Sequence, residues 1–247
     1  MSAGLASIWR HPIKSHGREP LDHVTLEAGQ CLPWDRTWAV AHERSGADGS
    51  EWAPCANFSR CAKAPQLQAI TARLDPAAGQ ITLSHPDRPG LTFDPDGDAG
   101  TFLDWVRPLM PEDRAPSARI VRARSRGMTD SDFPSVTLCN LASHRAVEQR
   151  MGRELSIHRW RGNLWLDGLA PWEEFDWIGR ELRIGGATLR VRERTGRCAA
   201  TMANPETGAR DADTLGALKT WGHADFSVRA EVVAGGEIAR GDLLEMS

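Results

Sequence analysis

The feature that most constrains this chain is a succession of short apolar or alternating runs separated by turn residues. The runs on either side of 75–79 (Asp-Pro-Ala-Ala-Gly) and of Gly185-Gly186 have the pattern of β-hairpins. Helical spacing of apolar residues is confined to three segments, namely 98–110, 143–151 and a run that begins at Asp213. Many short strands with few short helices predict a mixed α/β but mainly β protein with a barrel-like architecture.

The pattern also predicts where individual elements begin and end. Strands are expected at residues 5–10, 36–41, 66–74, 80–84, 118–123, 136–139, 163–168, 181–184, 187–192, 228–234 and 237–244. We expect Ser143 to cap a helix that stops at Gly152, and Pro108 to end or bend the helix before it. The proline-containing segment 111–116 is the best linker candidate, so we predict two domains, 1–115 and 116–247.

Composition excludes several classes of protein. A chain of 247 residues with 40% hydrophobic and 26% charged residues has the make-up of a globular protein with a sizeable core. The net charge of -3 argues against general nucleic-acid binding. No apolar run approaches the length of a membrane span, and no secretory signal is evident. Five cysteines at irregular spacing fit a reducing compartment, so we expect a cytoplasmic protein.

One stretch, residues 194–208, carries the clearest chemical signal. Cys198 follows an arginine and precedes small or hydroxylated residues, and the stretch ends in the turn Asn-Pro-Glu-Thr-Gly. Nearby cations favour a thiolate, and small neighbours leave room beside the sulfur. Spacing alone is more typical of a half-buried strand cysteine that only packs.

This stretch resembles the cysteine motif of the MOSC-domain family, named after the C-terminus of molybdenum cofactor sulfurase. The family includes the amidoxime-reducing components and their bacterial relatives. The match covers Arg-Cys-x-x-Thr, from Arg197 to Thr201, and the following Pro-x-Thr-Gly. The resemblance implies that the Cys198 thiolate binds molybdenum and is catalytic. Asn204 stands where many members carry aspartate.

Two segments near the N-terminus strengthen the resemblance. Residues 9–15 are similar to the family's Tyr-Pro-x-Lys-Ser opening motif, with histidine in place of tyrosine, and residues 34–38 match its Asp-Arg-x-Trp strand. The resemblance implies that Lys14, Ser15 and Arg36 bind the pterin and its phosphate. Ammonium, hydroxyl and guanidinium groups are suitable donors for such an anion. The alternative for Arg36 is a structural ion pair with its neighbour, Asp35.

A third segment, 159–168, is similar to the family's Phe-Arg-Pro-Asn strand. Arg161 and Asn163 match its arginine and asparagine, and Gly162 replaces its proline. With Thr195 and Arg197 beside the cysteine, these residues complete the expected cofactor-binding set. The resemblance implies an N-terminal β-barrel-like domain followed by a MOSC β-barrel domain, with the cofactor between them.

Arginines are crowded in residues 119–126 and 190–197. They indicate either solvated strand faces or a site for a polyanionic ligand. Other chemistries lack their sequence motifs. The chain has no Gly-x-Ser-x-Gly elbow, no dinucleotide-binding fingerprint and no Cys-x-x-Cys pair.

The resemblance implies a molybdenum-dependent oxidoreductase that reduces small N-hydroxylated compounds and carries Mo-molybdopterin. Without a flavin, nicotinamide or iron–sulfur motif of its own, the chain is expected to receive electrons from a separate flavin or iron–sulfur protein. The alternative is a non-catalytic carrier of molybdenum cofactor or sulfur.

Overall fold

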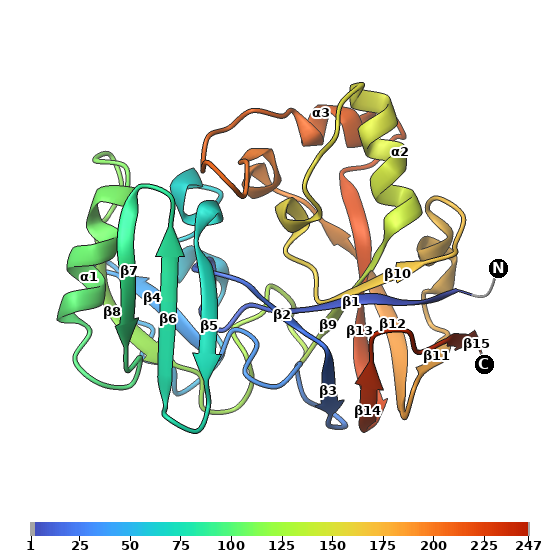
Figure 1. Ribbon diagram of the computed structural model, residues 1–247, viewed down its shortest axis with the longest axis horizontal. Coiled ribbons are helices and arrows are strands. Elements are labelled where there is room, and N and C mark those ends of the chain that lie inside the picture. Colours follow the sequence, from blue (N-terminus) through green and yellow to red (C-terminus); the bar gives the residue numbers. More distant parts are fainter. Residues whose placement is uncertain (1–2, 247) are drawn as a thin grey trace.

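The computed structural model describes residues 3–246 and consists of two lobes that lie side by side (Figure 1). The larger lobe is built on an eight-stranded sheet of order β15-β11-β12-β13-β9-β10-β1-β2, which curls into a half-barrel. Its strands are β1 (Gly4–Arg10), β2 (Glu19–Leu21), β9 (Val136–Asn140), β10 (Leu164–Asp167), β11 (Glu181–Ile184), β12 (Ala187–Gly196), β13 (Asp225–Ala234) and β15 (Leu244–Met246). The prediction of a mainly β fold with few short helices is confirmed.

The smaller lobe contains two small sheets. One pairs β4 (Trp38–His42) with β8 (Ser117–Arg122), and the other joins β5 (Thr71–Asp75), β6 (Gln80–His85) and β7 (Arg88–Phe93). Helix α1 (Gly100–Val106) packs beside β7 and β8. Phe102, Trp105 and Val106 of this helix join a buried cluster with Leu83 and Phe93, so the lobe has its own apolar core.

Two further helices cover one end of the large sheet, as Figure 1 shows. They are α2 (Leu141–Met151) and α3 (Thr214–Lys219). Beneath them Trp160 stacks on Phe226, with ring centroids 3.9 Å apart, and Trp165 packs nearby. Short 3-10 helices complete the elements: η1 (Cys55–Asn57), η2 (Pro65–Ala69), η3 (Arg107–Leu109), η4 (Ile157–Trp160), η5 (Glu173–Trp177) and η6 (Ala199–Met202).

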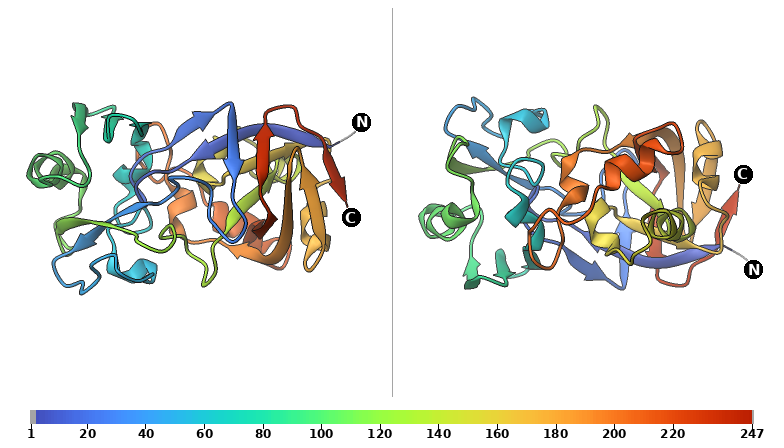
Figure 2. Two further views of the ribbon diagram at one scale, coloured as in Figure 1. Left: turned by 90° about the horizontal axis from the view of Figure 1, so that it is seen from below. Right: turned by 90° about the horizontal axis from the view of Figure 1, so that it is seen from above.

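The N-terminal segment binds the two lobes together. β1 pairs with β10 of the larger lobe, and Ile13 bridges Trp38 of β4 in the smaller lobe. In addition, β3 (His23–Leu26) pairs with β14 (Gly236–Ala239). Gly4 of β1 bridges Leu243, so the start of β1 lies close to β15 at the end of the molecule away from α1 (Figure 2). The proposed division between residues 115 and 116 stays a prediction, and these strand pairs cross it, as does the pairing of β4 with β8.

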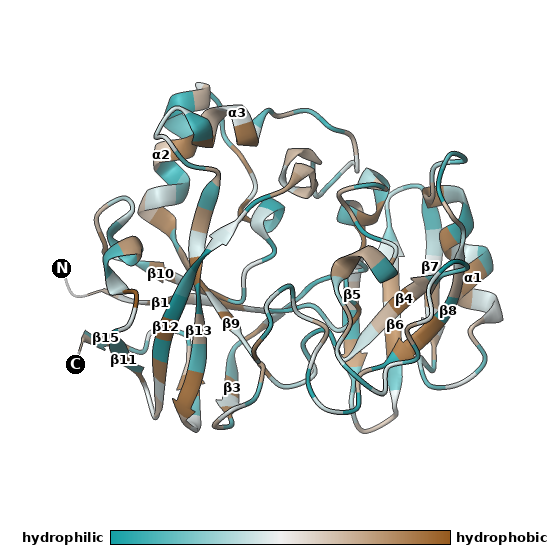
Figure 3. Cartoon of the chain, turned by 180° about the vertical axis from the view of Figure 1, so that it is seen from behind, coloured by the Kyte–Doolittle hydropathy of each residue, from teal (hydrophilic) through white to brown (hydrophobic). Residues whose placement is uncertain are grey.

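Local patterns account for the long strands and their turns. Bands of hydrophobic and hydrophilic residues alternate along β13 (Figure 3), and its buried valines and alanines meet those of β12 in the core. The hairpins at 75–79 and 185–186 form as predicted. In each, a glycine with positive φ makes the turn, at 66° for Gly79 and 53° for Gly185.

Several expectations differ from the structure. The expected strand 237–244 is divided between β14 and β15, which belong to different sheets. The run 66–74 is not one strand, because Pro65 starts the 3-10 helix η2 before β5 begins. Strand β7 was not expected, since Pro89 and Gly90 disfavour strands; it lies at a sheet edge, where proline is tolerated. The cap of α2 is Asn140, whose side chain accepts from the amide of Ala142, and not Ser143.

Candidate functional site

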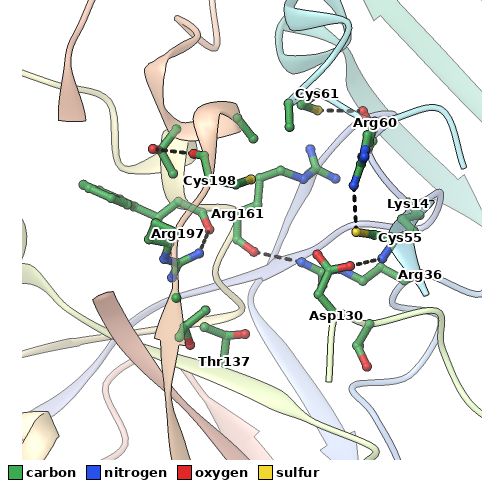
Figure 4. A pocket seen from close by; sticks show the side chains of 18 of the residues that line it. Lys14, Arg36, Cys55, Arg60, Cys61, Asp130, Thr137, Arg161, Arg197 and Cys198 are labelled. Carbon is green, nitrogen blue, oxygen red and sulfur yellow. Dashed lines mark hydrogen bonds and ion pairs between the residues drawn. The ribbon is translucent and has the colours of Figure 1, made fainter. Parts of the chain in front are cut away.

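A cavity with about 1000 Å³ of empty space, including its mouth, opens between the two lobes (Figure 4). Its wall combines residues from distant parts of the chain: Lys14, Ser15, Arg36, Cys55, Arg60, Cys61, Ala62, Thr129, Asp130, Ser135, Thr137, Arg159, Trp160, Arg161, Thr195, Gly196, Arg197, Cys198, Ala200, Thr201 and Arg229. Seven of the eight predicted site residues are among them.

Cys198 sits where β12 ends and the 3-10 helix η6 begins. It is a free thiol and is exposed, whereas Cys31, Cys61 and Cys139 are buried. Its backbone carbonyl accepts hydrogen bonds from the amide and the hydroxyl of Thr201, at 3.2 and 3.1 Å. The short helix therefore holds the cysteine in place and leaves its sulfur accessible, which argues against a cysteine that only packs.

Arg197 lies against the aromatic cluster beside Cys198. Its guanidinium donates to the carbonyls of Phe226 and Trp160 and to the hydroxyl of Ser227. Burial lowers the pKa of Arg197 to about 10. Among residues 3–246, no carboxylate lies within ion-pair distance of the Arg197 guanidinium. All the acceptors of its hydrogen bonds are therefore uncharged oxygen atoms.

The opposite wall is built around Lys14, which is buried. Its ammonium donates to the carbonyl of Met128 at 2.6 Å and to the carboxylate of Asp130 at 2.5 Å. Burial lowers the pKa of Lys14, and Asp130 opposes that shift. The Asp130 side chain is partly exposed, and attraction to Lys14 lowers its pKa. The pair is therefore ionic.

Three predicted site residues have an uncommon backbone conformation. Ser15, Arg36 and Arg161 have φ values of 64°, 53° and 49°, in the left-handed region that non-glycine residues rarely occupy. Such conformations cost of order 1–3 kcal/mol each and tend to cluster at functional sites. All three residues line the same cavity, which indicates that their backbone conformations serve the shape of its wall.

Arg36 forms the structural ion pair that the sequence left open as an alternative, and it also lines the cavity. It forms an ion pair with the buried Asp35, which also accepts from the amide of His11. The same guanidinium donates to the carbonyl of Arg161 at 2.9 Å and lines the cavity. Asp35 thus holds Arg36 in a fixed position, and Arg36 links the N-terminal segment to the segment that carries Arg161.

Arg161 points into the cavity in Figure 4. One terminal nitrogen, Nη2, donates to the carbonyl of Gly17 at 3.3 Å, and the other, Nη1, is buried without a hydrogen-bond partner. Burial lowers its pKa. The next residue, Gly162, packs against the sulfur of Cys139 where a Cβ atom would collide, which explains a glycine at that position.

Asn163 is the predicted site residue that does not line the cavity. It is 1% exposed, accepts from the amide of Thr137 through Oδ1 and donates to the carbonyl of Trp9 through Nδ2. It joins β9 to the end of β1, so its influence on a ligand is indirect. By contrast, Thr195 lines the cavity and its buried hydroxyl has no hydrogen-bond partner.

Several lining residues were not predicted. Asp130, Arg159 and Arg229 come from segments that pair or pack only in the folded chain, as do Arg60 and its neighbours Cys55 and Cys61. Only Arg159 had a sequence signal, because it belongs to the same arginine-containing segment as Arg161. The crowded arginines at 190–197 are mostly on a solvated face: Arg190 pairs with Glu181 and Arg192 with Glu231.

The cavity is strongly cationic, although the chain as a whole is acidic. Seven cationic side chains line it against one carboxylate, that of Asp130. Three buried polar atoms of its lining residues lack hydrogen-bond partners, namely Nε of Arg159, Nη1 of Arg161 and Oγ1 of Thr195. Unpaired buried donors are costly unless a ligand satisfies them. The site is therefore built for an anionic ligand close to an accessible thiol.

The turn after the cysteine is retained despite its asparagine. Asn204 accepts from the amide of Glu206 through its side chain, as an aspartate would, and Gly208 closes the turn with a φ of 71°. The amide group of Asn204 also donates to Asp211 at 2.9 Å. Asp211 in turn binds Arg159 of the cavity wall.

Comparison with known families covers most of the chain. Residues 128–245 match the family model described as the MOSC domain, and residues 2–104 match the model described as the MOSC N-terminal beta barrel domain. No curated protein gives a significant match. None of the helices in residues 3–246 combines the length and the apolar composition needed to cross a membrane.

Solved structures with a similar fold include YuaD from Bacillus subtilis. The match covers 100% of this chain and 96% of that one, with 12% identity and a TM-score of 0.51. YiiM from Geobacillus stearothermophilus is 21% identical, with a TM-score of 0.36 over 45% of this chain, and YiiM from Escherichia coli is 15% identical, with a TM-score of 0.33. This chain spans about half the length of each YiiM structure (53%).

Proposed function

Because the chain belongs to the MOSC-domain family, which is associated with molybdenum cofactor binding, we propose that it is an oxidoreductase that reduces N-hydroxylated compounds. The observation that carries the proposal is an exposed thiol, Cys198, at the wall of a cavity with a large excess of cationic side chains. When bound, the molybdenum cofactor supplies a metal centre that exchanges two electrons with an N–O bond.

The residues of the cavity fit such a cofactor. Lys14, Arg36 and Arg161 would hold its phosphate and other anionic groups, with the hydroxyls of Ser15 and Thr195 as further donors. The unpartnered Nη1 of Arg161 and Oγ1 of Thr195 support this assignment. Each charged hydrogen bond is worth roughly 1.5–3 kcal/mol.

Cys198 would be the protein's bond to the metal, since molybdenum accepts soft thiolate ligands. Within residues 3–246 no group of three or more histidine, cysteine, aspartate or glutamate side chains could hold a metal ion. A single protein thiol therefore suits a metal that arrives with most of its ligands already in place. Arg197 precedes Cys198 in the chain, and its hydrogen bonds to the carbonyls of Phe226 and Trp160 fix a positive charge on the same cavity wall.

Electrons would come from a separate flavin or iron–sulfur protein, because the chain has no sequence motif for either group or for a nicotinamide cofactor. We also propose a cytoplasmic location, consistent with five cysteines that are all free in the structure. The alternative function, a carrier of molybdenum cofactor or sulfur, is favoured by the exposure of Cys198, which would let a bound group be handed on.

Reconstitution separates these functions. Protein purified with its molybdenum should reduce benzamidoxime to benzamidine when a chemically reduced viologen dye supplies electrons, and it should not do so with NADH alone. Turnover with NADH and no second protein would contradict the need for a partner. Full molybdenum loading without turnover on any donor would favour the carrier function.

A further inference from the structure

Arg60, Arg159 and Arg229 are the cations of the cavity that the assignments above leave without a role, and of these three Arg60 is the one without a carboxylate partner among residues 3–246. It lies on the wall formed by the smaller lobe, opposite the wall that carries Cys198. In Figure 4 its side chain points into the cavity, and its Nη1 donates to the sulfur of Cys55 at 3.0 Å. A thiol is a weak acceptor, so this contact leaves most of the guanidinium's five N–H donors available.

The turn that carries Arg60 is fixed from both sides. The carbonyl of Arg60 accepts from the amides of Lys63 and Ala64, both at 2.9 Å. The next residue, Cys61, donates to the carbonyl of Ser15 at 3.2 Å, and Arg210 of the opposite lobe donates to the carbonyl of Ala62 at 2.7 Å. Contacts from both lobes therefore hold the turn that carries Arg60 in place. A side chain on a fixed turn loses less conformational freedom when a ligand binds, which favours a binding role.

Among residues 3–246, Arg60 differs from three other cavity arginines in having no carboxylate partner, a feature that it shares with Arg161 and Arg197. Arg36, Arg159 and Arg229 each form an ion pair with a carboxylate, those of Asp35, Asp211 and Glu193 respectively. In the described part of the chain, Arg60 has no carboxylate within ion-pair distance. The one acidic side chain of the cavity, Asp130, is already paired with Lys14.

We propose that Arg60 is a specificity-determining residue that binds a carboxylate of the substrate. The inference rests on the proposed function, in which the reducible N–O group lies near Cys198. A molecule that extends from there across the cavity meets the wall that carries Arg60. A guanidinium fork binds a carboxylate with two parallel hydrogen bonds, so substrates that carry this group are preferred over neutral ones.

The kinetic experiment compares 4-carboxybenzamidoxime with its methyl ester, using reduced viologen as donor. The loaded wild-type protein should favour the carboxylate by about tenfold or more in kcat/KM, mainly through KM. Arg60→Met should abolish the preference and Arg60→Lys should retain part of it. Lys63→Met is the matched control: it removes the same charge from the same turn, outside the cavity, and should keep the full preference.

A binding experiment tests the same site without turnover. Calorimetric titration of the loaded protein with 4-carbamoylbenzoate and with its methyl ester should show tighter binding of the anion, and Arg60→Met should remove that difference. Loss of turnover on every substrate with the anion preference intact would overturn the proposed function alone. The role of Arg60 would be overturned if the wild-type protein bound the two probes equally. It would also be overturned if Arg60→Met lowered the molybdenum loading and left the preference for the anionic probe unchanged.

Discussion

At the scale of single residues, the site contains three of the six non-glycine residues with positive φ in the part of the chain that the structure describes. Ser15, Arg36 and Arg161 adopt positive φ angles, and none of them is a glycine. The contacts around them compensate for the strain: Arg36 is held by Asp35, and its side chain reaches the carbonyl of Arg161. The geometry of the cavity wall therefore depends on mutual contacts between residues far apart in the chain.

Replacement of Cys198 by serine should separate the metal ligand from the structure around it. We expect Cys198→Ser to reduce activity to the level of the buffer control and to remove the sulfur-to-metal contribution from the absorption spectrum. Thermal unfolding should be unchanged, because the side chain is exposed and its carbonyl makes the hydrogen bonds.

The matched control is Cys31→Ala, which removes a thiol that does not line the cavity. Molybdenum content and activity should be retained in that variant, and likewise when Cys55, Cys61 or Cys139 is replaced by alanine. A Cys198→Ser protein with full activity and the wild-type spectrum would exclude thiolate ligation by this residue.

At the scale of elements, helix α2 shows how one local signal was assigned to the wrong residue. Asn140 caps the helix, and Ser143 faces the core instead. The Ser143 hydroxyl donates to the buried carboxylate of Glu174 at 2.9 Å and accepts from the amide of Trp172 at 2.7 Å. Burial raises the pKa of Glu174, and its hydrogen bonds from Asn140 and Ser143 oppose that rise.

Ser143→Ala should therefore lower the free energy of unfolding by about 1–3 kcal/mol, because it leaves a buried carboxylate and an amide with fewer partners. The loss should be larger at neutral than at acidic pH, since the hydroxyl donates more strongly to the ionised form of Glu174. Chemical denaturation at the two pH values measures both effects.

A suitable control lies on the same helix. Arg145→Ala removes an exposed ion pair with Asp167 and should change the unfolding free energy by no more than about 0.5 kcal/mol. A Ser143→Ala variant as stable as this control at neutral pH would show that Glu174 does not need the hydroxyl.

At the scale of the whole molecule, the chain is closed by pairings between its two halves. β1, β3 and β4 have their partners β10, β14 and β8 beyond residue 115. The hydrophobic core of the large sheet likewise combines Leu5 and Ile8 with residues from β9 to β14. The first half therefore depends on the second for both backbone hydrogen bonds and buried apolar surface.

A fragment that ends at residue 115 should consequently fail to fold cooperatively. Residues 1–115 alone should give a broad, non-cooperative thermal transition by circular dichroism, whereas the full chain unfolds in a sharp one. Mixing this fragment with residues 116–247 should restore part of the cooperative signal. A sharp transition for the isolated fragment would indicate an independently stable unit.

The sequence by itself determined the local features of this protein. The hairpins at 75–79 and 185–186, the cap of α3 at Asp213 and the stop of α2 at Gly152 all formed where expected, because each depends on neighbouring residues alone. The cysteine and arginine motifs likewise identified seven residues that the fold brings to one cavity.

Only the tertiary structure decided which groups face that cavity. Asn163 belongs to a site motif, yet it hydrogen-bonds within the sheet, while Arg60 and Asp130 enter the cavity from segments without a motif. The reason is physical: the wall is formed by strand pairs and turns that join residues more than a hundred positions apart, such as Lys14 with Asp130. Such contacts are determined by the packing of the two lobes, which no local pattern encodes.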